Sequence, residues 1–183
     1  MSIQQNLTAP FRFLYDKGCD PHSKNCFGCN AVLWCAQGKG NEDTLAWLRN
    51  VESSFDCVNS NGHSAIHKTA QRGNRVLCEW LVNSLLSGDG GERQYLIQPD
   101  IEGNCPSDLS RAEGYEDLAE WLSMQECEYA KRTQHTNMPT WLEKPAAASP
   151  GVQRMARCLL DNMPKPEECG DRVRCCEDMA DID

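Results

Sequence analysis

The sequence predicts an all-α protein in which three pairs of helices follow one another along the chain. A glycine lies seven residues before a Trp-Leu pair three times, at positions 40 and 47, 73 and 80, and 114 and 121. Such self-similarity indicates a repeated structural unit. Each copy also begins with a glycine, and these leading glycines, Gly28, Gly62 and Gly103, are 34 and 41 residues apart. The repeat length therefore suits a helix pair with short connections.

The middle copy shows why each unit should fold as two helices. Ser64 precedes the first helix and can cap its free amide groups, and Gly73 can end that helix in a left-handed conformation. Leu77, Trp80 and Leu81 then form the apolar stripe of a second, antiparallel helix. One such pair cannot bury both of its faces, so neighbouring pairs should stack and share a core. The equivalent tryptophans are expected to form a ladder along that stack.

Taken in order, the elements divide the chain into a repeat domain and an extension. We expect the repeat domain at residues 1–131, with an N-terminal cap at 1–24 and repeats at about 25–58, 59–99 and 100–131. The helix pairs are expected at about 30–50, 64–87 and 106–131, and about eight inserted residues at 87–95. Apolar residues of the N-terminal segment are expected to cap the first repeat: Phe11, Phe13, Leu14 and Tyr15.

Residues 132–183 are expected to hold a proline-rich linker, one short helix and a cysteine-rich acidic tail. The helix is predicted at about 152–162, with Met155, Leu159 and Leu160 on one apolar face. That face and Trp141 have two interpretations. They fold back on the groove of the repeats, or they form a docking peptide for another protein.

The order of residues in the middle copy resembles the ankyrin repeat, D-x-x-G-x-T-P-L-H-x-A-A-x-x-G followed by a second helix. The matching positions are Asn59, Gly62, Ser64 to His67, Thr69, Ala70 and Gly73. The third copy departs by having Asp108 at the histidine position, and the first has Asn25 at the aspartate position and Leu33 at the histidine position. The resemblance covers roughly residues 14–122. It implies an ankyrin-repeat solenoid of stacked antiparallel helix pairs with short hairpin loops.

Composition and charge exclude some functions. The net charge of −9 disfavours a nucleic-acid partner, because affinity for a phosphate backbone rests on basic contacts. No apolar stretch is long enough to span a membrane, and no secretory signal is visible. We expect a cytoplasmic protein, with nuclear residence also open. The chain lacks the glycine loops, nucleophile elbows and metal-binding histidine pairs of common enzymes, so neither catalysis nor a cofactor is expected.

Twelve cysteines raise the question of a metal or redox site. Cys26 and Cys29 have zinc-ligand spacing, but Cys19 and Cys35 have no close companion. Because Cys19, Cys35 and Cys78 fall at small or helical positions of the pattern, we interpret them as buried, reduced core residues. Four C-terminal cysteines have no place in the repeat and leave metal binding, redox sensing, S-acylation of the Cys175–Cys176 pair or plain exposure open: Cys169, Cys175 and Cys176, together with Cys158.

What the resemblance implies is a protein–protein interaction module: a scaffold, an adaptor, or a regulatory or structural subunit of a larger hetero-complex. Its partner would bind hairpin tips and first-helix residues on the concave face. In this chain these positions are Cys26, Phe27, Cys29, Gln37, Ser60, Asn61, His63, Gln71, Arg72, Ile101, Glu102, Asn104 and Glu113. Phe27 is the expected anchor, because aromatic residues dominate interface energetics. The alternative is a metal-binding or redox-sensing protein that uses the C-terminal thiols.

Overall fold

The computed structural model describes residues 8–38, 40–86, 97–133 and 149–160, and it contains only helices, turns and loops in these ranges. The all-α prediction is therefore confirmed for this part of the chain. None of the helices within it has both the length and the apolar character needed to cross a bilayer. The predicted insertion at 87–95, the tail segment around Trp141, and Cys169, Cys175 and Cys176 lie outside the described residues.

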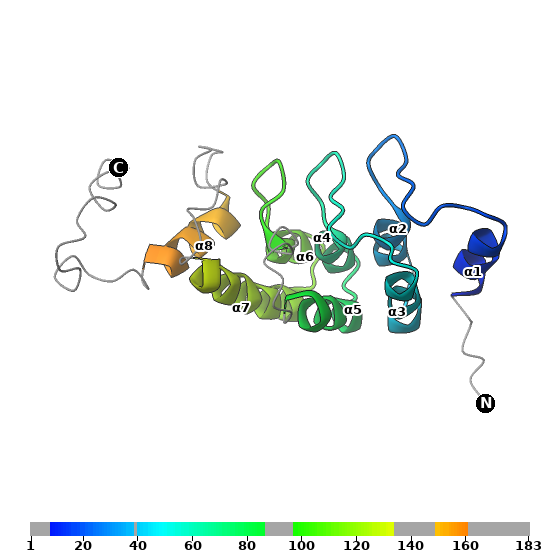
Figure 1. Ribbon diagram of the computed structural model, residues 1–183. Helices are drawn as coiled ribbons and strands as arrows, with labels where there is room; N and C mark the ends of the chain where they lie inside the picture. The colour runs from blue at the N-terminus through cyan, green and yellow to red at the C-terminus, as the bar shows by residue number, and fades with distance from the viewer. Residues whose placement is uncertain (1–7, 39, 87–96, 134–148, 161–183) are drawn as a thin grey trace, which may run out of the picture.

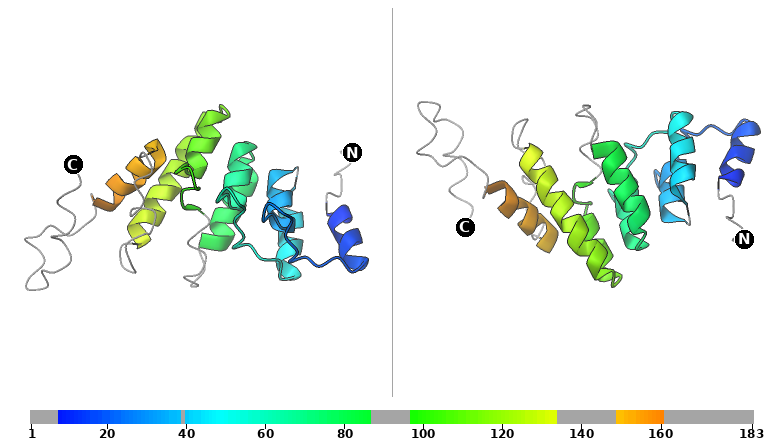
Figure 2. Two further views of the ribbon diagram at one scale, coloured as in Figure 1. Left: turned by 90° about the horizontal axis from the view of Figure 1, so that it is seen from above. Right: turned by 90° about the horizontal axis from the view of Figure 1, so that it is seen from below.

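Six helices form three consecutive pairs, which we call units 1 to 3 in chain order (Figure 1). The pairs are α2 (Ala31–Gln37) with α3 (Glu42–Asn50), α4 (Ala65–Gln71) with α5 (Arg75–Leu81), and α6 (Pro106–Ala112) with α7 (Glu116–Thr133). A π-helical segment, Val82–Leu86, continues α5. The first helices lie side by side in one layer, and the second helices form another (Figures 1 and 2). The helix-pair positions expected from the sequence are thus correct.

Asparagine side chains fix the starts of three of these helices. Asn30 Oδ1 accepts a hydrogen bond from the backbone N–H of Leu33 at 3.1 Å. Asn41 caps α3 through the N–H of Thr44 at 3.0 Å, and Asn74 caps α5 through that of Leu77 at 3.2 Å. Each bond satisfies an amide that the helix itself leaves unpaired. The polar residues that precede each apolar run therefore set where these helices begin.

The core lies between the two layers and continues from one unit to the next. Its largest buried side chains come from both helices of the units: Leu33, Leu45, Leu48, Ile66, Leu77, Leu81 and Leu122. The tryptophans lie at its edge, partly buried. Trp47 packs edge-on against Tyr15 with ring centroids 5.6 Å apart, and Trp80 packs against Phe55 at 6.1 Å.

The tryptophan ladder expected from the sequence is wrong in its details. Trp121 is covered by the guanidinium of Arg75, 5.5 Å from the ring centroid. The ring contacts of Trp47, Trp80 and Trp121 thus join each of these three to a side chain of the preceding unit or of α1, and not to another tryptophan. Each of these three tryptophans therefore packs at a different junction along the stack.

Helix α8 (Pro150–Leu160) folds back and covers the end of unit 3 (Figures 1 and 2). Met155 and Leu159 are buried there in a second apolar cluster with Ile97, Cys105, Tyr129 and Ala130. Of the two interpretations of this amphipathic helix, the structure supports packing within the same chain. The helix begins at Pro150, two residues earlier than expected, because proline is well tolerated in a first helical turn.

At Gly62, both the backbone conformation and the neighbouring atoms disfavour a side chain. Its φ is +76°, and a Cβ added there would lie 2.9 Å from the amide nitrogen of Ile101 and 3.1 Å from Cα of Asp100. We expect Gly62→Ala to lower the free energy of unfolding by about 2–4 kcal/mol, since a left-handed alanine alone costs about 1–2 kcal/mol. Chemical denaturation measures this loss.

Gly114→Ala is the matched control for this prediction. Its φ is +84°, but nothing lies within 4 Å of the added Cβ. The control should therefore lose only the free energy that a left-handed alanine costs, about 1–2 kcal/mol. Equal losses in both variants would contradict the idea that close contact between neighbouring loops sets the cost at Gly62.

Candidate interaction surface

Each unit is preceded by a hairpin loop, and the three loops share one set of hydrogen bonds. The loops are residues 25–29, 59–63 and 100–104. Asn25 Oδ1 accepts from the backbone N–H of Phe27 at 3.0 Å and of Cys29 at 2.9 Å. Asn59 and Asp100 make the two equivalent bonds in their own loops, at distances from 2.8 to 3.0 Å. A side chain that bonds its own backbone in this way holds a tight turn.

Backbone hydrogen bonds also join each loop to the next. The N–H of Ser60 donates to the carbonyl oxygen of Phe27 at 2.9 Å, and the N–H of Ile101 donates to that of Asn61 at 3.2 Å. These donors and acceptors occupy equivalent positions relative to Gly28, Gly62 and Gly103. The three loops, which we call the loop row, therefore project to the same side of the protein in a fixed register (Figure 1).

The tips of the loop row expose two large apolar side chains. Phe27 is 63% exposed and Ile101 is 69% exposed. The other tip positions between and beside them are also exposed, and all of them were predicted to contact a partner: Cys26, Ser60, Asn61 and Glu102. Asn104 is only partly exposed. The structure thus brings most of the predicted loop residues together on one rigid row.

The predicted helix positions lie apart from the loop row. Gln37 and Gln71 are the last residues of α2 and α4, and Arg72 and Glu113 follow the ends of α4 and α6. A seven-residue helix is about 10 Å long, so this group lies roughly that far from the loops. Arg72 Nε donates to the carbonyl oxygen of Gln37 at 3.0 Å, which ties neighbouring units together.

Cys29 and His63 were predicted to offer surface to a partner, and the structure buries both of them. His63 turns inward because its Nε2 lies 3.0 Å from the carboxylate of Asp100 in the next loop. Its ring stacks on that of His67, with centroids 5.5 Å apart. His63 therefore stabilises the loop row from its buried side and does not offer surface to a partner.

His67 is wholly buried under the loop row. Its Nδ1 accepts a hydrogen bond from the backbone N–H of Ser64 at 3.3 Å, and Ser64 Oγ lies 2.9 Å from the same nitrogen. Burial, and then the neighbouring His63, lower the pKa of His67 to about 3. The ring is therefore neutral at physiological pH and acts as a hydrogen-bonded core residue.

An apolar cavity of about 290 Å³ lies at the N-terminal end of the stack, where α1 (Ala9–Asp16) meets unit 1. Its walls include Phe11, Leu14, Tyr15, Trp34 and Trp47. The sequence predicted that α1 caps this end, but Phe13 and Leu14 are more than half exposed. Helix α1 thus covers the end of the stack incompletely, which sequence reasoning missed because it assigned every apolar residue of α1 to burial.

The cysteines fall into distinct environments. Burial raises the pKa of the Cys35 thiol to about 12 and that of Cys78 to about 11, in agreement with their expected role in the core. Cys19 is exposed, which corrects its predicted burial. No three metal-ligating side chains gather in the described ranges. The weak metal candidates Cys169, Cys175 and Cys176 lie beyond those ranges.

Cys127 and Cys158 form a disulfide between α7 and α8. The sequence predicted reduced thiols in the repeats, because a stack with its own core needs no disulfides and no secretory signal is visible; the disulfide corrects this for Cys127. The pairing becomes visible only once α8 has folded back on α7.

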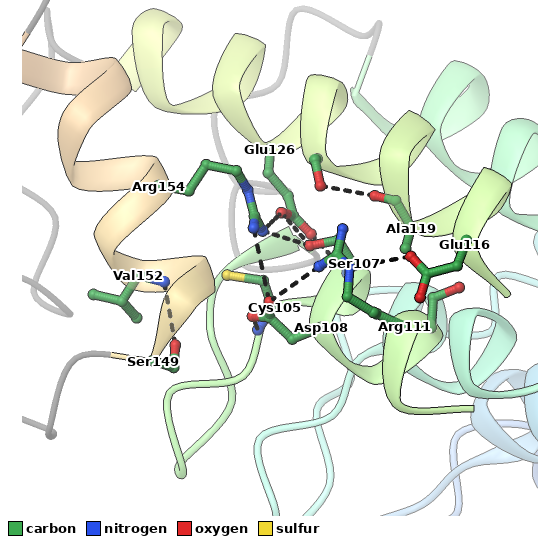
Figure 3. Close-up of polar contacts among 12 residues, drawn as sticks. Cys105, Ser107, Asp108, Arg111, Glu116, Ala119, Glu126, Ser149, Val152 and Arg154 are labelled. Atoms are coloured by element: carbon green, nitrogen blue, oxygen red, sulfur yellow. Dashed lines mark hydrogen bonds and ion pairs between the residues drawn. The ribbon is translucent and has the colours of Figure 1, made fainter. Parts of the chain in front are cut away.

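A buried ion pair joins α7 to α8 between Glu126 and Arg154 (Figure 3). Glu126 of α7 is fully buried, and its carboxylate accepts a hydrogen bond from Arg154 Nη2 at 2.6 Å. Ser107 of α6 supplies two more donors, its N–H at 2.8 Å and its hydroxyl at 2.7 Å. Burial raises the pKa of Glu126 in spite of these donors. Arg154 of α8 therefore supplies the positive charge in a buried polar network whose other members belong to unit 3.

Comparison with known proteins adds no further evidence of family. No protein-family model matches the chain, and no curated protein matches it significantly. The case for function therefore rests on the geometry described above.

Proposed function

We propose that this chain is a protein–protein interaction module with an ankyrin-like arrangement of its helix pairs, and that its partner binds along the loop row. One observation carries the proposal. Three loops are locked in register by hydrogen bonds from each loop to the next, and they expose Phe27 and Ile101 at their tips.

The loop row suits recognition because it is rigid before binding. Asn25, Asn59 and Asp100 each fix their own loop, so little conformational freedom is lost when a partner docks. The tips combine exposed apolar groups with polar ones, as interfaces that form between separately folded proteins do. The helix-end group at Gln37, Gln71, Arg72 and Glu113 lies within reach of a partner that crosses the first helices.

Phe27→Ala should weaken binding of the partner without unfolding the units. Loss of an aromatic anchor at an interface costs about 2 kcal/mol or more, roughly thirtyfold in Kd. Because Phe27 is mostly exposed, its removal leaves the core untouched. The measurement is affinity purification of the tagged protein from its native cells with mass spectrometry, followed by titration of the recovered partner against wild type and variant.

Val76→Ala is the matched control for Phe27→Ala. Val76 is also exposed and apolar, but it lies on α5 in the second-helix layer. We expect it to bind the partner as the wild type does. A weaker complex with Val76→Ala and an unchanged one with Phe27→Ala would place the interface on the second helices and overturn the proposal.

A further inference from the structure

Helix α8 covers the end of unit 3 through three kinds of contact. Met155 and Leu159 are buried in the apolar cluster, Arg154 pairs with Glu126, and the hydroxyl of Ser149 donates to the carbonyl oxygen of Gly103. The Cys127–Cys158 disulfide adds a covalent link between α7 and α8. Without the disulfide, α8 is held to unit 3 by one short apolar face and one polar network.

The docked position of α8 keeps the residues beneath it buried. Cys105 is fully buried, and its Sγ lies 3.4 Å from the sulfur of Met155. A Cβ added to Gly151 would lie 2.8 Å from the same Sγ, so the first turn of α8 sits directly on this thiol. Release of α8 would uncover Cys105 together with the carboxylate of Glu126.

The residues of the disulfide are less buried than the core thiols. Cys127 and Cys158 are both only half-buried, in contrast to Cys35, Cys78 and Cys105, which are buried. Thiol–disulfide exchange requires that a dithiol reach one of the two sulfurs, and the partial exposure of both residues favours this.

We propose that the Cys127–Cys158 disulfide is a redox-controlled latch, which keeps α8 docked over the end of the stack when oxidised and allows α8 to undock when a dithiol reduces it. In the reaction, a thiolate of the dithiol attacks one sulfur and the S–S bond breaks, giving a mixed disulfide. The second thiol of the reductant then displaces the protein sulfur. Cys127 and Cys158 end as thiols, and the two-electron donor ends as an intramolecular disulfide.

The latch acts at the opposite end of the stack from the cavity beside α1, and it contacts the loop row at the carbonyl oxygen of Gly103, not at the exposed side chains of Phe27 and Ile101. It is thus distinct from the proposed binding of a partner along the loop row. It shares Cys158 with the C-terminal cysteines considered for redox sensing, but it needs none of Cys169, Cys175 and Cys176.

The test is the alkylation rate of Cys105 in the full-length chain. The protein is oxidised with oxidised glutathione, or reduced with dithiothreitol and desalted, and then pulsed with N-ethylmaleimide before peptide mapping. We expect Cys105 to react about tenfold faster or more in the reduced protein, because its exposure follows local opening. The double variant Cys127→Ser/Cys158→Ser should react at the fast rate in either condition.

Cys35 and Cys78 are internal controls, since they lie in units 1 and 2 and should stay protected throughout. Three results would overturn the proposal. The oxidised protein yields no Cys127–Cys158 cross-linked peptide, Cys105 reacts equally slowly in both forms, or Cys35 and Cys78 become reactive together with Cys105, which would indicate unfolding of the whole stack. Hydrogen exchange at the amides of α8 gives an independent readout, with faster exchange expected on reduction.

Discussion

Arg154→Met should lower the free energy of unfolding by about 2–4 kcal/mol, because it leaves the Glu126 carboxylate buried without its charged partner. Glu126 is fully buried, and Ser107 alone would remain to donate to it. The loss should be smaller at acidic pH. Burial already raises the pKa of Glu126, so lowering the pH protonates the orphaned carboxyl and removes the buried charge. Urea denaturation at several pH values measures both effects.

Two further variants distinguish the effect of breaking the ion pair from that of removing a positive charge. Arg157→Met removes the same charge from an exposed position on α8 and should change stability by less than about 0.5 kcal/mol. Arg154→Met/Glu126→Gln removes both charges and should recover much of the loss, because replacing a buried pair is cheaper than breaking it. A double variant as unstable as Arg154→Met would show that the arginine acts through packing of its side chain.

The repeated part of this fold could be predicted from the sequence because its signals are local. Gly62 and Gly73 adopt positive φ, and Asn30, Asn41 and Asn74 cap helices within three residues of themselves. Such features act over one turn of chain, so spacing alone reveals them. The same holds for the loop tips, whose exposure follows from the position of each glycine.

Contacts between distant segments could not be predicted in this way. Arg154 and Glu126 are 28 residues apart, and Cys127 and Cys158 are 31 apart. Neither pair follows a periodic pattern, and each forms only after α8 docks. His63 was misassigned for a related reason, since its partner Asp100 belongs to the next unit. A single copy of the repeat shows which residues face a neighbour, but not which side chains that neighbour presents.

Acidification from pH 6.5 towards 3 should destabilise the protein, and His67 should account for much of the effect. The pKa of His67 is lowered from 6.5 to about 3, first by burial and then by His63. The unfolded chain therefore binds a proton that the folded chain excludes throughout this window. Stability rises with pH there, by up to about 1.4 kcal/mol per pH unit, and the contribution is complete above pH 6.5.

Two other buried groups have shifted pKa values, and their effects on stability must be separated from that of His67. Burial raises the pKa of Asp100, but hydrogen bonds from His63 and from the N–H groups of Asn104 and Glu102 outweigh it and hold the pKa below its usual value. Protonation of Asp100 therefore also lowers the stability of the fold as the pH falls. The raised pKa of Glu126 acts in the opposite direction, since protonation relieves its buried charge.

His67→Gln isolates the histidine, because glutamine does not titrate. We expect this variant to be less stable than the wild type at pH 7 but to lose stability less steeply between pH 6.5 and 3, as measured by urea denaturation across that range. His22→Gln changes an exposed imidazole and should keep the wild-type slope. A wild-type slope in His67→Gln would mean that its buried ring does not govern acid unfolding. Protonation of Asp100 would then account for the loss, because its carboxylate accepts the hydrogen bonds that hold the loop of unit 3.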